Sequence, residues 1–197
     1  MALPGFPPGT SANSNEVVIR SGRRGVFLDR DGVINRAIVR AGKPYAVQSL
    51  EDFEILPGVA DALARLRAAG FVNVVITNQP DVRTGKLPRT VVEAMHAQLL
   101  KNLPIDAVRA CFHVDSDGCD CRKPKPGMIL DAARELGIDL AHSFLVGDRW
   151  RDIAAGQRAR CKAFFIEHGY AEKKPEKPYV AVNSLPQAAQ LILQSER

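Results

Sequence analysis

Three aspartates stand where a parallel sheet could bring them together. Asp29 ends the apolar segment Gly25–Asp29, Asp31 follows two positions later, and Asp148 directly follows the apolar segment Ser143–Gly147. Residues two apart in an extended chain project to the same side, and carboxylates held that close repel each other unless a cation lies between them. Oxygen ligands of this kind suit Mg²⁺. The spacing therefore predicts a magnesium site at the ends of two strands.

A site of this kind can do chemistry on phosphate. Once a cation neutralises the phosphate, one carboxylate can attack phosphorus and form an aspartyl phosphate. A second carboxylate can protonate the leaving oxygen and later take a proton from water. Strand-end aspartates more often cap helices or turns, so Asp29 or Asp148 alone would indicate little. All three together, with Gly32 permitting close approach of the backbone, favour the catalytic interpretation.

Other polar residues follow the remaining apolar segments. Thr77 ends Phe71–Thr77 beside backbone N–H groups that could bind a phosphoryl oxygen. Lys123 could stabilise the charge of a phosphoryl group, and Arg122 could grip a second phosphate or a hydroxyl-rich molecule. The alternatives are a threonine that only ends a strand and a solvated basic turn. Pro124 and Pro126, which follow the basic pair, argue for a rigid loop.

The cysteines are unevenly placed. Cys111, Cys119 and Cys121 fall within eleven residues and enclose His113, whereas Cys161 lies apart. Two pairs with i, i+2 spacing can supply the four ligands of a tetrahedral zinc site. A buried Cys111 with a surface His113 is the alternative, and Cys161 is expected to be a small core residue.

Length and composition bound the class of protein. The chain has 197 residues, 46% hydrophobic and 25% charged, with a net charge of +5. These values exclude collagen, a disordered chain and a disulfide scaffold, and no apolar run approaches the ~20 residues of a spanning helix. The positive charge indicates an anionic partner. Neither a P-loop nor a glycine-rich dinucleotide motif is present, which disfavours NTP-dependent kinases and dinucleotide enzymes.

Apolar runs alternate with helical patterns, which predicts an α/β fold: a three-layer, Rossmann-like parallel sheet with helices on both faces and no large cap domain. The expected strands are Gly25–Asp29, Phe71–Thr77, Arg109–Val114, Ser143–Gly147 and Lys162–Glu167, with a sixth at Tyr179–Val182. Expected helices cover residues 58–69, 89–102, 126–136 and 186–195. We expect residues 1–20 to form a flexible tail and residues 21–197 a single domain with a zinc loop at 111–121.

The motifs resemble those of the haloacid dehalogenase superfamily of phosphohydrolases. They comprise DxDG after the first strand, Thr after the second, Lys before a helix and GDxxxD after the fourth, over about residues 24–170. FLDRDGVIN, TNQ, CDCRKPKPGM and VGD are similar to a small cap-less branch that contains heptose bisphosphate and histidinol phosphatases. That branch carries a structural zinc loop.

The resemblance implies a role for each matching residue. Asp29 would be the nucleophile and Asp31 the acid and base, while Thr77 and Lys123 hold the phosphoryl group. Mg²⁺ would be bound by Asp29, the main-chain carbonyl of Asp31 and Asp148, with support from Asp152. The residues expected to contact substrate are Asn35, Asn78, Gln79, Arg122 and Arg149. Zn²⁺ would be held by Cys111, His113, Cys119 and Cys121.

The resemblance also implies a function. We expect a cytoplasmic, monomeric phosphatase of a small phosphorylated sugar, first of all D-glycero-D-manno-heptose 1,7-bisphosphate. Histidinol phosphate is an alternative substrate, and a nucleic-acid 3′-phosphatase or a non-catalytic nucleic-acid-binding module is more distant, since only 6% of residues are aromatic. Three departures from the family lie on loops that would select the substrate. They are the short His113–Cys119 loop, Pro80, which lacks an N–H, and a long basic loop at Arg36–Tyr45.

Overall fold

A six-stranded parallel sheet is the centre of the computed structural model, which describes residues 22–195. Its order is β5-β4-β1-β6-β7-β8. The strands are β1 (Gly25–Leu28), β4 (Val72–Asn78), β5 (Ala107–Cys111), β6 (Phe144–Gly147), β7 (Lys162–Ile166) and β8 (Val180–Val182). The tail expected at residues 1–20 lies outside the described residues.

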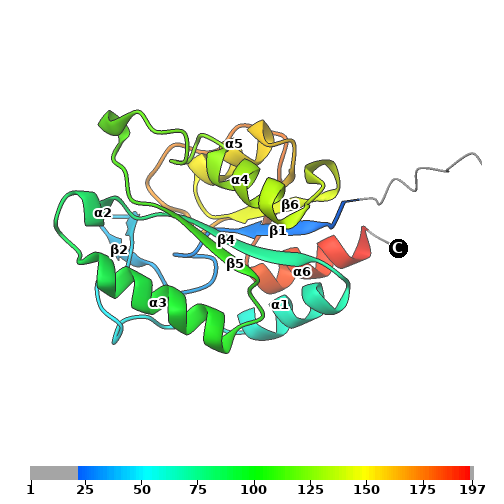
Figure 1. Cartoon of the computed structure of the whole chain (residues 1–197), viewed down its shortest axis with the longest axis horizontal. Helices are drawn as coiled ribbons and strands as arrows, with labels where there is room; N and C mark the ends of the chain where they lie inside the picture. Colours follow the sequence, from blue (N-terminus) through cyan, green and yellow to red (C-terminus); the bar gives the residue numbers. More distant parts are fainter. Residues whose placement is uncertain (1–21, 196–197) are drawn as a thin grey trace, which may run out of the picture.

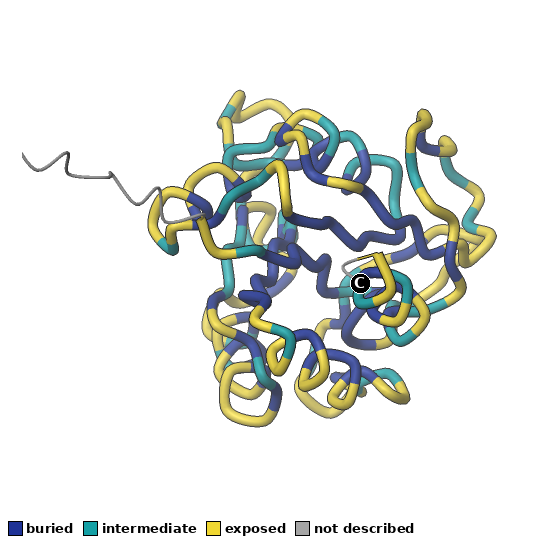
Figure 2. The backbone as a smooth tube through the Cα atoms, turned by 90° about the vertical axis from the view of Figure 1, so that its right-hand side faces the viewer, coloured by how far each residue is buried: buried dark blue, intermediate teal, exposed yellow. Residues whose placement is uncertain are grey.

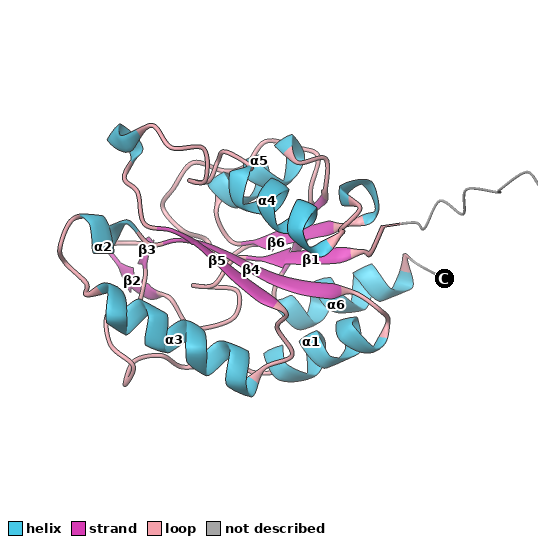
Figure 3. Ribbon diagram, in the orientation of Figure 1, coloured by secondary structure: helices cyan, strands magenta, loops and turns pink. Residues whose placement is uncertain are grey.

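Helices cover both faces of this sheet (Figures 1 and 3). On one face lie α1 (Val59–Ala68), α3 (Arg89–Asn102) and α6 (Leu185–Gln194); on the other lie α4 (Gly127–Leu136) and α5 (Trp150–Arg158). A short helix, α2 (Pro80–Arg83), precedes α3, and single turns of 3₁₀ helix occupy Asp115–Asp117 and Leu140–His142. The predicted three-layer α/β fold is confirmed, and residues 22–195 contain no large cap domain.

The strands at the middle of the sheet are buried on both faces, as Figure 2 shows. In β1, Val26 and Leu28 belong to the apolar cluster under α1 and α6, whereas Phe27 belongs to the cluster under α4 and α5. All three are fully buried. Strands covered on both faces require apolar residues at every position. This requirement makes them recognisable in the sequence as short continuous apolar runs.

Helix α5 was not predicted. Its sequence WRDIAAGQR contains Gly156, which weakens helices, and few large apolar residues. A Cβ at position 156 would lie 2.9 Å from the Cβ of Leu145, so the glycine lets the helix pack closely on β6. Packing against the sheet thus overrides local propensity.

The prediction of a loop at Arg36–Tyr45 is wrong, because most of this segment forms a β-hairpin. Strands β2 (Ile38–Arg40) and β3 (Lys43–Tyr45) pair antiparallel. The two residues between them, Ala41 and Gly42, have φ values of 49° and 74°. Such a turn is usually signalled by Asn-Gly, and alanine at positive φ gives no such signal.

The third expected strand, Arg109–Val114, is also displaced. The observed β5 begins two residues earlier and ends at Cys111, where the chain leaves the sheet. The apolar pattern continues past that point, but the following residues join the cysteine cluster instead.

Among residues 22–195, no helix has the length and apolar character needed to cross a membrane.

Candidate active site and metal centre

The candidate site lies at the carboxyl end of β1, where the next strands along the chain are added first on one side of β1 and then on the other. Strand β1 pairs with β4 on one side and with β6 on the other. The carboxyl ends of these strands form the crevice in which open α/β sheets bind ligands. A cavity of about 60 Å³ lies there. Its lining residues are Asp29, Asp31, Pro44, Tyr45, Ala46, Thr77, Asn78, Lys123, Arg149, Arg151 and Asp152.

Three buried carboxylates gather at this crevice. Asp29, Asp148 and Asp152 each offer an oxygen within 4.8 Å of the others. Burial, followed by the charge of Asp152, raises the pKa of Asp29 to about 6. Burial and the charge of Asp29 raise the pKa of Asp148 well above its ordinary value.

Asp148 fits a metal ligand best. Both of its carboxylate oxygens are buried and accept no hydrogen bond of ordinary geometry from the described residues, although the nearby Tyr170 hydroxyl offsets part of the rise in the pKa of Asp148. A Cβ at Gly32 would lie only 1.9 Å from Oδ2 of Asp148, so the backbone after Asp31 approaches this carboxylate closely. A buried carboxylate without donors is costly unless a cation binds it. The donor set is all oxygen, as Mg²⁺ requires.

A buried ammonium group lies between two of the carboxylates. Nζ of Lys123 lies 2.7 Å from Oδ1 of Asp29 and 2.6 Å from Oδ1 of Asp152, and it donates to the carbonyl of Ile76 at 2.8 Å. Burial alone would lower the pKa of Lys123, but the charges of Asp152 and Asp29 outweigh it and raise that pKa. The lysine therefore carries a fixed positive charge at the cavity.

Asn78 holds the lysine from the neighbouring strand. Its Nδ2 donates to the backbone carbonyl of Lys123 at 3.0 Å, and the backbone N–H of Lys123 donates to its Oδ1 at 3.1 Å. Asn78 lines the cavity as expected. Its amide also fixes the loop that carries the lysine.

The carboxylate of Asp31 is surrounded by donors. Arg30 donates through Nε and Nη2 at 2.9 to 3.2 Å. Asn35 donates through Nδ2 at 3.0 Å and Gln79 through Nε2 at 2.9 Å. Gln79 also donates to Oγ1 of Thr77 at 3.0 Å. These hydrogen bonds orient Asp31 and Thr77, which the sequence placed at the ends of the first two expected strands.

Not all expected substrate contacts lie on the cavity. The described residues that line it do not include Asn35, Gln79 or Arg122. Asn35 and Gln79 are fully buried and contact Asp31 instead. Arg122 lies beside the cavity, with Nε donating to Asp115 at 2.7 Å. Arg149 does line the cavity and forms an ion pair with Glu172.

Sequence reasoning missed several residues of the site. Arg151 lines the cavity, and its guanidinium lies 3.1 Å from the carboxylate of Asp115. Tyr45 reaches the cavity from β3. Arg151 stands two positions after Arg149, and recognition of α5 would have placed it near that residue. The sequence placed the segment Arg36–Tyr45 near the substrate, but it did not single out Tyr45, because the hairpin that directs this residue to the cavity was not predicted.

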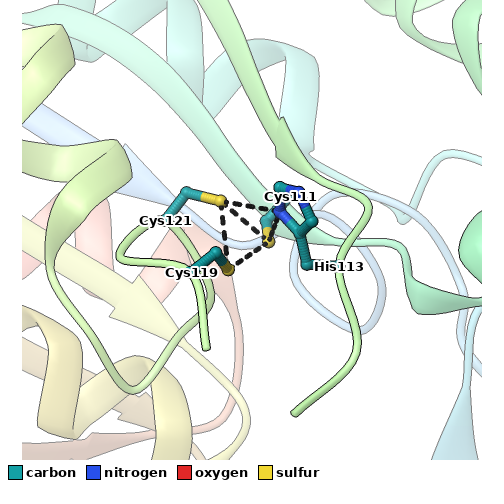
Figure 4. Close-up of side chains that lie close together, drawn as sticks. All are labelled: Cys111, His113, Cys119 and Cys121. Atoms are coloured by element: carbon teal, nitrogen blue, oxygen red, sulfur yellow. Dashed lines mark hydrogen bonds between the residues drawn. The ribbon is translucent and has the colours of Figure 1, made fainter. Parts of the chain in front are cut away.

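The cysteine cluster lies next to this site, and its four ligands converge (Figure 4). Cys111 ends β5, and the loop that follows brings His113, Cys119 and Cys121 against it. Five of the six separations among their Sγ and Nδ1 atoms lie between 3.0 and 3.7 Å. A tetrahedral zinc with Zn–S bonds of about 2.3 Å has edges of about 3.7 Å. The donor set therefore fits a closed Cys₃His zinc site.

The fold and the cavity together define a class of protein. They describe a hydrolase with an α/β fold. Its buried carboxylates, fixed lysine and threonine hydroxyl can hold a divalent cation and a tetrahedral anion. The cavity is small, and most of the residues that line it are charged or polar. It suits the end of a phosphate ester better than a large apolar ligand.

The chain belongs to the haloacid dehalogenase-like hydrolases, whose family model matches residues 11–160. It is 34% identical over 158 residues to the D-glycero-beta-D-manno-heptose-1,7-bisphosphate 7-phosphatase of Pseudomonas aeruginosa, covering 78% of this chain and 86% of the relative. The protein of that name from Rhodopseudomonas palustris is 38% identical, with 74% and 84% covered. The expected family and enzyme class are confirmed at this level, because these relatives are phosphatases.

A solved structure is similar across most of the chain. The D,D-heptose 1,7-bisphosphate phosphatase from B. bronchiseptica, complexed with magnesium and phosphate, matches with a TM-score of 0.75 and 32% identity. The match covers 87% of this chain and 99% of the other. The similarity therefore includes the sheet and the loops at its carboxyl end.

Replacing Asp148 tests the cation site. In EDTA, Asp148→Asn is expected to raise the free energy of unfolding by about 1 kcal/mol or more, since it removes a buried charge from a crowded cluster of carboxylates. Mg²⁺ should stabilise the wild-type protein and leave the variant almost unchanged. Thermal unfolding with and without Mg²⁺ measures both effects.

Asp120→Asn is the matched control, because that carboxylate is 95% exposed. It should respond to Mg²⁺ as the wild-type protein does. Equal stabilisation of the wild-type protein and Asp148→Asn by Mg²⁺ would contradict the assignment of Asp148 as a ligand.

Proposed function

We propose that the protein is a Mg²⁺-dependent phosphatase of a small phosphorylated sugar, with D-glycero-D-manno-heptose 1,7-bisphosphate as its substrate. The observation that carries this proposal is the pair of unpartnered buried oxygens on Asp148, beside Asp29 and its lysine. The relatives named above support the substrate. The proposed enzyme acts as a monomer, with residues 21–197 forming one domain.

Asp29 is the nucleophile in this proposal. Its carboxylate oxygen forms a bond to phosphorus as the ester P–O bond breaks, giving an aspartyl phosphate. Asp31 gives a proton to the leaving oxygen in this step. It then takes a proton from the water that attacks phosphorus, and Asp29 is released as a carboxylate. Mg²⁺, when bound, neutralises the charge of the phosphate and brings it to Asp29.

The positions of the side chains support the set of metal ligands and phosphoryl contacts that the family resemblance implies. Asp29, the main-chain carbonyl of Asp31 and Asp148 would hold Mg²⁺. Asp152 supports the site by pairing with Lys123 and by accepting the backbone N–H of Arg149 at 2.9 Å. Thr77 and Lys123 would hold the phosphoryl oxygens.

The outer part of the cavity would bind the rest of the substrate. Arg149 and Arg151 both line it, and Arg122 lies beside it with a buried Nη1 that has no partner among the described residues. Guanidinium groups suit a second phosphate and sugar hydroxyls. In the absence of a cap among residues 22–195, Tyr45 of the hairpin closes one side of the cavity.

Zn²⁺ has a structural role in this proposal. A site with four protein ligands leaves no open position for substrate. Cys121 lies two residues before Lys123 in the chain, so the metal would fix the loop that carries the lysine. Its contribution to catalysis would be indirect.

Replacing the nucleophile tests the reaction. Asp29→Asn is expected to lower kcat by about a thousandfold or more, because a neutral amide cannot attack phosphorus. Mg²⁺-dependent release of phosphate from an aryl phosphate measures the loss, and thermal unfolding checks the fold. Asp131→Asn, on the outer face of α4, should keep full activity. Turnover by Asp29→Asn close to the wild-type rate would rule out Asp29 as the nucleophile.

A comparison of substrates tests specificity. We expect kcat/KM for heptose 1,7-bisphosphate to exceed that for histidinol phosphate and for a 3′-phosphorylated oligonucleotide by about a hundredfold. Arg149 and Arg151 can bind its second phosphate, which histidinol phosphate lacks, and a cavity of about 60 Å³ is small for an oligonucleotide. Steady-state kinetics at fixed Mg²⁺ measures the ratios. A preference for histidinol phosphate or for the oligonucleotide would replace the proposed substrate while leaving the phosphatase chemistry intact.

Replacing one cysteine tests the zinc site. Metal analysis should find one Zn²⁺ per wild-type chain, and Cys119→Ser should lose the metal and about 2 kcal/mol or more of stability. Cys161→Ser is the matched control, because Cys161 is a buried cysteine outside the cluster. It should keep the zinc. A wild-type protein that is stable without zinc would contradict the Cys₃His assignment.

A further inference from the structure

A buried arginine contacts the expected acid and base. Arg30 follows β1, and its side chain is completely inaccessible to solvent. Through Nε and Nη2 its guanidinium contacts both carboxylate oxygens of Asp31. The guanidinium is planar and stiff, so its position sets the plane of a carboxylate bound to it. Whatever fixes Arg30 therefore also orients Asp31.

The other end of this guanidinium contacts helix α3. Nη1 of Arg30 lies 3.3 Å from Nε2 of His96 and 3.7 Å from Sδ of Met95. The ring of Phe53 lies 5.6 Å from the guanidinium carbon. A guanidinium has only donors, so the contact with His96 is a hydrogen bond only if the imidazole nitrogen accepts.

The surroundings of His96 favour an accepting imidazole. The residue is only 9% exposed, and burial followed by the charge of Arg30 lowers its pKa to about 4. Asp31 and Glu93 act in the opposite direction but do not outweigh these effects. The ring is therefore neutral at pH 7, and its Nε2 can accept the hydrogen of Arg30.

We propose that His96 is a positioning residue for the acid–base step, acting through Arg30 on the carboxylate of Asp31. This inference rests on the proposed function of Asp31. Neither Arg30 nor His96 lines the cavity formed by the described residues, so neither is placed to touch the substrate. The three side chains form one buried line from α3 to the catalytic crevice.

The proposed role predicts a dependence on the leaving group. An alkoxide leaving from a sugar or alkyl phosphate needs the proton of Asp31 as the P–O bond breaks. A nitrophenolate leaves as a stable anion and needs this proton far less. Disturbing the orientation of Asp31 should therefore slow hydrolysis of alkyl phosphates selectively. A loss of fold or of Mg²⁺ binding would slow both reactions alike.

The experiment compares kcat/KM for glycerol 2-phosphate and for 4-nitrophenyl phosphate at saturating Mg²⁺. His96→Leu removes the acceptor and should lower the alkyl value by about tenfold or more while changing the aryl value less than about threefold. His96→Gln keeps an oxygen acceptor and should recover most of the alkyl activity. Arg30→Lys loses the fork and should show the same selective loss as His96→Leu.

His142→Leu is the matched control, because this histidine is exposed on the 3₁₀ turn that precedes β6. Both of its kcat/KM values should equal those of the wild-type protein. If His96→Leu does not fold, His96→Met supplies the same comparison with a flexible side chain that favours helix. Thermal unfolding identifies which variants are folded.

The possible results separate the two proposals. An equal loss on both substrates, or no loss on either, would overturn the role of His96. Failure of His96→Gln to recover more alkyl activity than His96→Leu would also overturn it. A wild-type protein that binds Mg²⁺ but hydrolyses neither of these phosphates nor heptose 1,7-bisphosphate would instead overturn the proposed function.

Discussion

Charge balance among buried groups is the constraint on which the site depends. Asp29, Asp148 and Asp152 contribute three negative charges, and Lys123 contributes one positive charge between two of them. The remaining charge of −2 equals that of one divalent cation in magnitude. Asp31 is not part of this sum, because Arg30 neutralises it at 2.9 Å. The site is therefore built so that a cation completes it.

The fold makes this crowding of charges possible because the charged residues come from separate elements. The carboxylates follow β1 and β6, the lysine comes from the loop before α4, and Asp152 comes from the first turn of α5. Parallel strands buried on both faces hold their ends rigidly, so the charges cannot move apart. Because β1 has neighbours on both sides, the charged groups at these strand ends face one crevice.

Much of the sheet could be predicted from the sequence because its strands are short apolar runs. Every strand of the sheet was anticipated, and so were the metal-ligand candidates that follow from strand ends. Helix α5 and the β2–β3 hairpin were not, since Gly156 in the helix and the positive φ of Ala41 in the turn both go against local propensity. The same limit applies to Arg151 and Tyr45, whose place in the site depends on those two elements.

The contacts of Asn35 and Gln79 show a second limit. Sequence position placed both near the substrate, but their amides donate to Asp31 from behind the cavity. A residue beside a catalytic group in the chain can face the substrate or can orient that group. Which of the two it does depends on the direction of its side chain, which the spacing of residues does not specify. The role of His96 is still harder to predict from the sequence, because α3 contacts Arg30 only through tertiary packing.

Asp115 links the cysteine cluster to the opening of the cavity. It lies between His113 and Cys119 in the chain, and its carboxylate contacts both Arg122 and Arg151. Their hydrogen bonds hold the pKa of Asp115 below its ordinary value, so it stays charged. Neither arginine can turn towards a second anionic group without weakening its bond to Asp115. The conformation of the short cysteine loop thus controls how much positive charge the cavity presents, in a chain whose described residues include no cap to select the substrate.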